Sequence, residues 1–266
     1  MSEALLFHKT FPHPTSKEWV VFVHGAGGSS SIWFKQIKAY KQHFNLLLID
    51  LRGHGKSNQL LKELISNRYT FKAVTQDILK VLDHLKIQSA HFVGMSLGTI
   101  IVRNVAELAA ERVKSMVLGG AVTRLNTRSQ LLVKLGNMCK HIVPYMWLYS
   151  LFAYIVMPQR AQKESRHLFI REAKKLCQKE FKRWFILTSE VNPLMRYFKD
   201  RELPIPTLYL MGDRDYMFIQ PVKEMVAAHR DSQLLEIENC GHVCNVERPD
   251  EFNHHSIAFI QEQIKA

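Results

Sequence analysis

Ser96 is the residue whose setting most clearly predicts chemistry. It lies in the pentapeptide GMSLG, between the apolar run AHFV and the helical pattern TIIVRNVAELAA. Small residues on both sides of a serine permit a sharp turn between a strand and a helix, and such a turn exposes the hydroxyl. Because G-x-S-x-G also occurs by chance, the inference depends on this context. The pattern predicts that Ser96 is a nucleophile.

A serine hydroxyl needs a base, and His242 is the best placed histidine. It follows the last predicted strand, whereas His229, His254 and His255 fall in helical patterns where surface roles are expected. Imidazole can take a proton near neutral pH and return it to a leaving group. We therefore predict His242 as the general base.

The base in turn needs a carboxylate to orient it, and the chain offers two. Asp213 and Asp215 follow the apolar run TLYLMG, between Ser96 and His242 in the order nucleophile, acid, histidine. A carboxylate at the end of a strand can also simply close a turn. These residues alone leave both aspartates open as the acid.

Attack of Ser96 on a carbonyl would create an oxyanion that needs fixed hydrogen-bond donors. The backbone N–H of Leu97, at the start of a predicted helix, is one donor by position. The glycine-rich segment HGAGG, residues 24–28, follows the first strong strand and is expected to supply the second, with Ala26 favoured. HGAGG is equally explained as a tight strand-to-helix connection, and the two explanations are compatible.

Two other motifs partly match metal-binding and nucleotide-binding patterns. Cys240, His242 and Cys244 alternate, but no second cluster with zinc-like spacing accompanies them, and the four cysteines form no C-x-x-C pair. The segment DLRGHGKS resembles a phosphate-binding loop but has Asp50 where that loop needs glycine. We expect reduced thiols, no metal, no cofactor and no nucleic acid.

The elements that must position these residues are read from apolar runs. Six short runs predict strands, and helical patterns lie between them; the runs are 18–25, 44–50, 90–96, 113–120, 206–212 and 232–238. Near-continuous apolar strands alternating with helices predict an α/β fold, with a mainly parallel central sheet and helices on both faces. Ser96, both aspartates and His242 then share the carboxyl edge of the sheet.

The alternation stops at Ala121 and resumes near Pro204. Residues 121–203 show helical periodicity, as in RHLFIREAKKLCQKEFKRWFIL, without a convincing strand. We predict a core of residues 1–120 and 204–266 with a helical insertion, 121–203, above the edge where ligands bind in open α/β sheets. Its aromatic residues could line an apolar acyl pocket, and Trp147 and Trp184 are predicted to contact substrate.

With these motifs in order, the chain resembles the α/β-hydrolase superfamily. The resemblance rests on FVHGAGGSSSIW, LLIDLRGHGKS, FVGMSLG, PTLYLMGDRD and NCGHVCNVERPDEF. It implies a triad of Ser96, Asp215 and His242, because the acid in this family usually stands three residues after the strand-ending glycine, here Gly212. It also implies that the insertion is a cap over the pocket, and that the chain is a serine hydrolase.

Charge bears on the substrate. The chain has a net charge of +12, and residues 121–203 carry 16 Lys and Arg against 6 Asp and Glu, so +10 lies in the insertion and +2 elsewhere. Such a surface can serve solubility, or it can attract an anionic substrate, an acidic protein or a phospholipid surface. We expect a small-molecule ester or thioester, with an anionic or carrier-linked substrate as one form. Cleavage of a C–C bond in diketone-type acids, cofactor-free perhydrolysis, and a partner-binding signalling role stay open.

Composition and the first residues of the chain bear on its location in the cell. Apolar residues make up 47% and charged residues 23%, as in soluble globular proteins, and MSEALLFHKTFPHP lacks the pattern of a secretory signal. The longest uncharged stretch, residues 142–158, is shorter than the roughly 20 residues that span a bilayer. We expect a cytoplasmic location and no stable membrane insertion.

Overall fold

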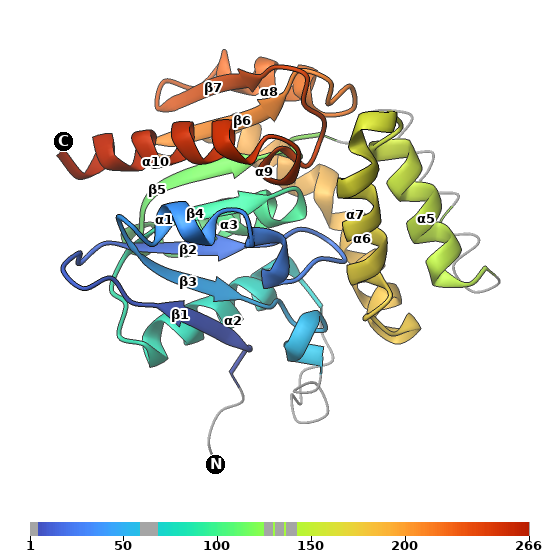
Figure 1. Ribbon diagram of the computed structural model, residues 1–266, viewed down its shortest axis with the longest axis horizontal. Coiled ribbons are helices and arrows are strands. Elements are labelled where there is room, and N and C mark those ends of the chain that lie inside the picture. Colours follow the sequence, from blue (N-terminus) through green and yellow to red (C-terminus); the bar gives the residue numbers. More distant parts are fainter. Residues whose placement is uncertain (1–4, 59–68, 125–129, 131–135, 137–142, 266) are drawn as a thin grey trace.

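The computed structural model describes residues 5–58, 69–124, 130, 136 and 143–265. Its centre is a seven-stranded sheet in the order β1-β3-β2-β4-β5-β6-β7 (Figure 1). The strands are β1 (His8–Phe11), β2 (Trp19–Val23), β3 (Asn45–Ile49), β4 (Ala90–Met95), β5 (Val113–Gly119), β6 (Thr207–Gly212) and β7 (Ser232–Ile237). All neighbours pair in parallel except β1, which is antiparallel to β3. The predicted α/β fold with a mainly parallel sheet is confirmed.

Strand β1 is the element that the apolar runs did not predict. Its four residues, HKTF, are partly or fully exposed, because β1 is one of the two edge strands of the sheet. Five of the six predicted strands are mostly buried and therefore carry near-continuous apolar residues, and the sixth, the other edge strand β7, keeps enough apolar residues in SQLLEI to be predicted. A short edge strand with mixed polarity gives no such signal.

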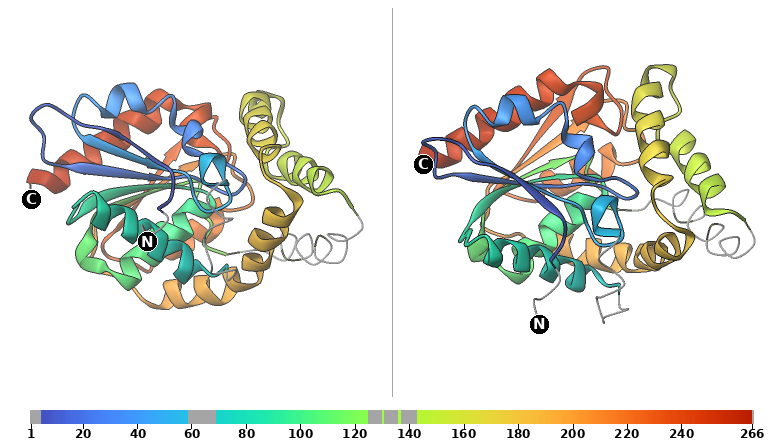
Figure 2. Two further views of the ribbon diagram at one scale, coloured as in Figure 1. Left: turned by 90° about the horizontal axis from the view of Figure 1, so that it is seen from below. Right: turned by 60° about the horizontal axis from the view of Figure 1, so that its bottom comes forward.

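Helices cover both faces of the sheet (Figures 1 and 2). One apolar core lies between the sheet and α2 (Phe71–His84), α3 (Leu97–Leu108) and α8 (Ile219–Val226). The other lies beneath α1 (Ile37–Tyr40), α9 (Cys244–Glu247) and α10 (Pro249–Lys265). Short 3₁₀ turns complete the core at η1 (Ser30–Trp33), η2 (Gly55–Asn58) and η4 (Ala110–Arg112).

The ends of the long helices follow local chemistry. Helix α2 starts after Thr70, whose side chain accepts a hydrogen bond from the Ala73 amide and so satisfies one of the free donors of the first turn. Helix α10 starts with Pro249, which has no N–H to leave unpaired and a backbone angle suited to a first turn. Phe252 and Ile260 of α10 are buried in the core.

Between β5 and β6 the described chain is helical. The elements there are α5 (Tyr145–Val156), η5 (Arg160–Gln162), α6 (Lys163–Ala173) and α7 (Gln178–Asp200), beside the carboxyl edge of the strands (Figures 1 and 2). The helical pattern at 166–187, continuous in the sequence, is divided between α6 and α7 by a turn at residues 174–177. Residues 125–142, apart from 130 and 136, lie outside the described chain, so the predicted insertion is described only in part.

Helix α5 contains most of the longest uncharged stretch and ends two residues before Pro158. None of the helices described here has both the length and the hydrophobicity needed to cross a bilayer.

Candidate active site

Ser96 occupies a tight turn between β4 and α3. Its backbone angles, φ 53° and ψ −120°, lie in a region that residues with a side chain rarely adopt. The turn is held by a hydrogen bond of 3.0 Å from the Ser96 amide to the Gly119 carbonyl. A Cβ atom on Gly94 would approach the backbone of Gly98 to 2.9 Å, so the space two residues before the serine is suited to glycine. The sequence pattern around Ser96 thus has a physical basis.

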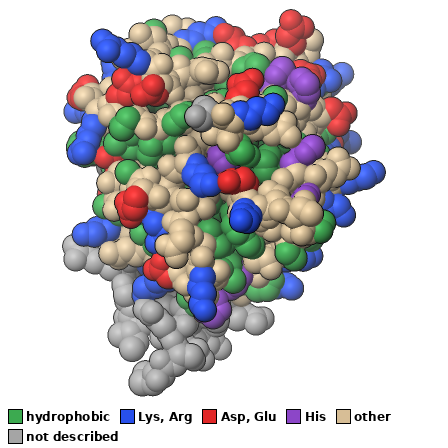
Figure 3. Space-filling model, turned by 90° about the vertical axis from the view of Figure 1, so that its left-hand side faces the viewer, with side chains coloured by type: hydrophobic (Ala, Val, Ile, Leu, Met, Phe, Trp, Pro, Cys, Tyr) green, Lys and Arg blue, Asp and Glu red, His purple; other side chains and the backbone are tan. Residues whose placement is uncertain are grey.

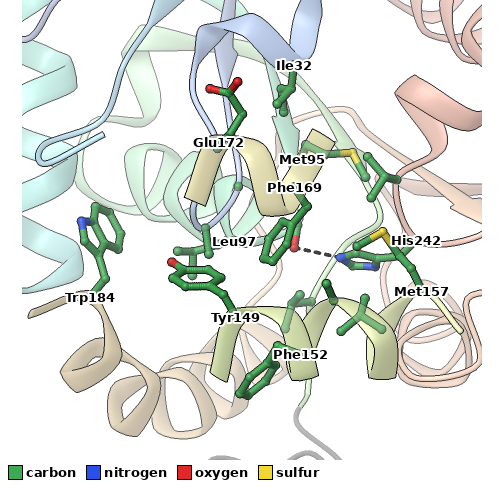
Figure 4. A pocket seen from close by; sticks show the side chains of 18 of the residues that line it. Ile32, Met95, Leu97, Tyr149, Phe152, Met157, Phe169, Glu172, Trp184 and His242 are labelled. Carbon is green, nitrogen blue, oxygen red and sulfur yellow. Dashed lines mark hydrogen bonds between the residues drawn. The ribbon is translucent and has the colours of Figure 1, made fainter. Parts of the chain in front are cut away.

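Two hydrogen bonds join Ser96, His242 and Asp215. His242 Nε2 lies 2.8 Å from Ser96 Oγ, the dashed line in Figure 4, and His242 Nδ1 lies 2.8 Å from Asp215 Oδ2. Asp215 is 1% exposed and His242 is 5% exposed. A carboxylate can only accept, so Asp215 fixes the proton on Nδ1 and leaves Nε2 to accept from the serine hydroxyl.

The second aspartate has a different role. Asp213 accepts a hydrogen bond of 3.0 Å from the Cys240 amide, so it ties the loop after β6 to the loop that carries His242. Asp215 itself is placed by its own amide, which donates to the Gly212 carbonyl at 3.0 Å. The two aspartates that the sequence left open are therefore separated by their partners.

The two predicted oxyanion donors lie at the same cavity. Ala26 and Leu97 both line it, and within the described chain neither backbone N–H has a hydrogen-bond partner. The next two amides are occupied, since Gly27 N–H donates to His54 Nε2 at 3.0 Å and Gly28 N–H donates to the Gly25 carbonyl at 3.1 Å. The turn thus holds the amides of Gly27 and Gly28 and leaves that of Ala26 available.

Two buried histidines support this turn, and the sequence analysis did not assign them a role. His24 Nε2 accepts the Leu51 N–H at 3.0 Å, and His54 Nε2 accepts the Gly27 N–H at 3.0 Å, with the two rings 5.0 Å apart. Burial lowers the pKa of both, that of His54 to about 3, so both are neutral at physiological pH. The sequence places a histidine beside a glycine in each of the two loops, and this pattern is the signal that could have indicated their supporting role.

A cavity of about 250 Å³ opens in front of Ser96 and His242 (Figure 4). Most of its wall is apolar and comes from the core loops, α3 and the three insertion helices. The side chains from the insertion include Tyr149, Phe152, Ala153, Val156, Met157, Leu168, Phe169, Phe181, Trp184, Phe185, Leu187 and Val191. A cavity of this kind suits an apolar group next to the reacting bond.

Of the two tryptophans predicted to contact substrate, Trp184 lines the cavity and Trp147 does not. Trp147 is 74% exposed on the outer side of α5. Helix α5 turns Tyr149, Phe152 and Val156 towards the cavity, and a residue two positions from Tyr149 cannot share that face. The prediction for Trp147 is wrong because composition does not reveal the rotation of a helix.

Glu172 of α6 is the acidic residue of the cavity wall, and the sequence analysis missed it. It is 2% exposed and accepts hydrogen bonds from the Ser29 hydroxyl at 2.7 Å and from Lys175 Nζ at 2.7 and 2.8 Å. Burial opposes its ionisation, but the bonds from Lys175 and Ser29 outweigh burial and lower its pKa. Among the described residues that line the cavity there is no Lys or Arg, so the basic side chains resolved here do not face it.

The alternating cysteines are not arranged as metal ligands. Cys240 and Cys244 are buried, and burial raises the pKa of both thiols, which keeps them protonated. Within the described ranges, no three His, Cys, Asp or Glu side chains gather as a metal site would require.

The insertion meets the core at three glycines. A Cβ atom on Gly27, Gly53 or Gly241 would collide with Tyr149, Glu180 and Gln162, respectively. These glycines belong to the turn of Ala26, the loop of His54 and the loop of His242. The insertion therefore touches three loops at the candidate site, those of Ala26, His54 and His242.

Comparisons with known proteins agree with the observed fold. The family model described as alpha/beta hydrolase fold matches residues 18–139. The chain is 24% identical over 250 residues to 3-oxoadipate enol-lactonase 1 of Acinetobacter baylyi, covering 90% of this chain and 87% of that protein. Among solved structures, the enol-lactonase from Burkholderia xenovorans LB400 aligns with a TM-score of 0.80, 21% identity and 96% coverage of each chain. MenH from S. aureus aligns with a TM-score of 0.79 and 20% identity, covering 96% of this chain and 98% of that one.

Proposed function

We propose that this chain, which belongs to the α/β-hydrolase superfamily, is a serine hydrolase that cleaves an ester or thioester with an apolar acyl group. The observation that carries the proposal is the hydrogen-bonded series Ser96, His242, Asp215 at the wall of an apolar cavity. The relatives support hydrolysis as the reaction class, because one that aligns over 90% of this chain is named a lactonase and a lactone is a cyclic ester.

In the proposed first step, Ser96 Oγ attacks the substrate carbonyl while His242 Nε2 takes the hydroxyl proton. Asp215 accepts the Nδ1–H and stabilises the imidazolium that forms. The bond to the leaving group then breaks as His242 returns the proton to the departing oxygen or sulfur. The product of this step is an acyl-enzyme on Ser96.

In the second step, water replaces the leaving group. His242 takes a proton from water, the hydroxide attacks the acyl carbon, and the proton returns to Ser96 Oγ as the acid leaves. In both steps the negative oxygen is held by the amides of Ala26 and Leu97, which have no partner within the described chain. Fixed donors that need no reorganisation commonly contribute a factor of about 10² to 10³ each to the rate.

We also propose that residues 121–203 act as a cap over a core formed by residues 1–120 and 204–266. Support comes from α5, α6 and α7, whose apolar side chains form much of the described cavity wall opposite Ser96. A wall of this composition excludes water from the oxyanion and binds hydrocarbon, since each buried CH₂ contributes about 0.8 kcal/mol.

A lactone is the second candidate substrate, favoured by the enol-lactonase relative. The same attack by Ser96 would open the ring, and the leaving oxygen would stay attached to the acyl group. An ionised acyl group finds no Lys or Arg among the described residues of the cavity wall, and the charged residue there, Glu172, is acidic and already bound to Lys175. The proposal therefore favours neutral esters and neutral lactones over anionic ones.

The experiment is turnover of p-nitrophenyl esters of graded acyl length and of neutral lactones, with fluorophosphonate labelling. Ser96→Ala should abolish both turnover and labelling. Ser165→Ala is the matched control, because this serine also lines the cavity but has no hydrogen bond to a base, and it should keep the labelling. Undiminished turnover in Ser96→Ala would refute the proposal.

A further inference from the structure

Helix α5 exposes an apolar face to solvent. Trp147, Leu151 and Tyr154 are 74%, 49% and 55% exposed, and their spacing of four and three residues places them on one side of the helix. We call these three residues the outer stripe. Helix α5 contains no charged residue from Tyr145 to Val156 and lies at the outer edge of the described insertion (Figures 1 and 2).

The packing of the protein explains only part of the outer stripe, because the Arg166 guanidinium lies 4.5 Å from the centre of the Tyr154 ring while all three side chains stay about half exposed or more. Single exposed apolar residues are ordinary, but three large ones on one helix face form a patch of the kind that marks an interaction site. The opposite side of α5 already packs against the cavity through Tyr149, Phe152 and Val156. A helix that is apolar on all sides is typical of burial in a core or contact with a membrane.

The charge around the outer stripe indicates the kind of partner. Helix α6 packs against α5 and carries the exposed basic residues Lys163 and Arg171, and the exposed Lys174 follows its last residue. Each acidic residue of α6 is matched by a basic partner, Glu164 by Lys35 at 2.9 Å and Glu172 by Lys175 at 2.7 Å, so the exposed lysines leave an excess of positive charge. The opposite end of the molecule, in Figure 3, shows acidic and basic side chains interspersed.

We infer that the outer face of α5 binds peripherally to an anionic phospholipid surface. Tryptophan and tyrosine favour the interface between water and hydrocarbon, and leucine favours the acyl region just beneath it. Each Lys or Arg near an anionic membrane adds about 1 kcal/mol of attraction. The helix lies along the surface and does not cross it, in agreement with its length of 12 residues.

This binding gives the cavity a source of substrate, a step that rests on the proposed function. The inner side of α5 forms part of the cavity wall, so the helix separates the lipid surface from the candidate nucleophile by its own thickness. A lipophilic ester that leaves the membrane at α5 enters the apolar cavity without crossing bulk water. The substrate class is then an ester with a long hydrocarbon chain.

A second copy of the chain is a poorer partner for the outer stripe. In a two-fold dimer through α5, both insertions would meet, and each carries a net charge of +10 from 16 Lys and Arg against 6 Asp and Glu. Repulsion of like charges opposes that arrangement, whereas an anionic bilayer neutralises them.

The test is co-sedimentation of the full chain with phosphatidylglycerol vesicles and with phosphatidylcholine vesicles. We expect binding to the anionic vesicles that weakens as salt rises. The triple variant Trp147→Ser, Leu151→Ser, Tyr154→Ser should reduce the partition coefficient at least about tenfold. The control, Leu108→Ser with Ile264→Ser, removes two exposed apolar side chains of the core and should bind like wild type.

Further measurements separate this inference from the proposed function. The triple variant should retain the melting temperature and the turnover of a short soluble ester, and it should lose only the rate gain on a long-chain ester presented in vesicles. Ser96→Ala should lose turnover and keep vesicle binding. Equal vesicle binding by wild type and the triple variant would overturn the inference, as would no binding to phosphatidylglycerol. A wild-type dimer in light scattering that the triple variant abolishes would assign the outer stripe to self-association and would also overturn it.

Discussion

The core and the insertion meet at one cavity, but they are held in different ways. In the core, Ser96 and Asp215 are fixed by backbone hydrogen bonds at the ends of strands, to Gly119 and Gly212. The insertion reaches the core through side chains, as in the hydrogen bond of 3.0 Å from Trp184 Nε1 to the Arg52 carbonyl. Backbone contacts fix the geometry that the chemistry needs, and side-chain contacts leave the wall of the cavity free to vary. In the proposed mechanism, the core therefore carries out the reaction and the insertion selects the substrates that fit.

The largest effect is expected in the core, where one aspartate should matter and its neighbour should not. Asp215→Asn removes the negative charge that stabilises the imidazolium and allows an N–H to face Nδ1, which favours the wrong tautomer of His242, so kcat should fall by about 10⁴-fold, as for the equivalent change in other triads. Asp213→Asn keeps an oxygen that can accept from the Cys240 amide and should largely preserve kcat. Steady-state kinetics on a p-nitrophenyl ester checks both. The opposite ranking would mean that the acid is misassigned.

In the insertion, one tryptophan should matter and the other should not, and the quantity that shows this is the free energy of unfolding. Trp184 packs against His54 at 4.9 Å between ring centroids and lines the cavity, so Trp184→Ala should cost about 3–5 kcal/mol of unfolding free energy. Trp147 is mostly exposed, so Trp147→Ala should change stability by less than about 0.5 kcal/mol. Urea denaturation gives both values. Similar losses of unfolding free energy for the two variants would contradict the buried position of Trp184 and the exposed position of Trp147.

The contact between the two regions can be tested at Gly241. A Cβ atom there would collide with the Gln162 side chain of the insertion, so Gly241→Ala should destabilise by about 1–3 kcal/mol. It should also lower kcat, because His242 is the next residue. Adding Gln162→Ala removes the obstructing side chain and should recover part of both losses. Strictly additive effects in this double-mutant cycle would show that the two residues are not in contact.

The smallest effect is a pH dependence of stability from His54. Its pKa is about 3 in the folded protein, because of burial, and 6.5 in the unfolded chain. Between these pH values the unfolded chain binds a proton at His54 that the folded protein does not bind. Acidification from pH 6.5 towards pH 3 therefore lowers the free energy of unfolding, and the stabilisation from neutral His54 is present in full only above pH 6.5. From pH 7 to pH 6 the loss should be less than about 1 kcal/mol. Chemical denaturation of wild type and His54→Gln over this range should show a smaller slope for the variant; identical slopes would mean that His54 is not buried as a neutral group.

Much of the core was predictable because its signals are local. A strand covered on both faces must be apolar along its whole length, and a turn that exposes Ser96 must have small neighbours. Each requirement leaves a trace in a few consecutive residues. The edge strand β1 left no such trace, because one of its long sides and much of its surface face solvent.

The insertion was predictable as helical but not in its details. The apolar spacing continues through residues 174–177, where the chain turns from α6 into α7. Glu172 gave no sign of facing the cavity, because its partner Ser29 is 143 positions away in the chain. Contacts of this range depend on how the helices are placed, and periodicity does not contain that information.

By itself, the sequence determined the parallel sheet, the turn at Ser96 and the order of the candidate catalytic groups, since each follows from the types of neighbouring residues. The family resemblance favoured Asp215 over Asp213, but only the tertiary structure gave each aspartate its partner, turned Trp184 inward and Trp147 outward, and left the amide of Ala26 without a partner in the described chain while that of Gly27 is held by His54. The physical reason is that a hydrogen bond or a packed face depends on both partners, and here the partners come from distant parts of the chain.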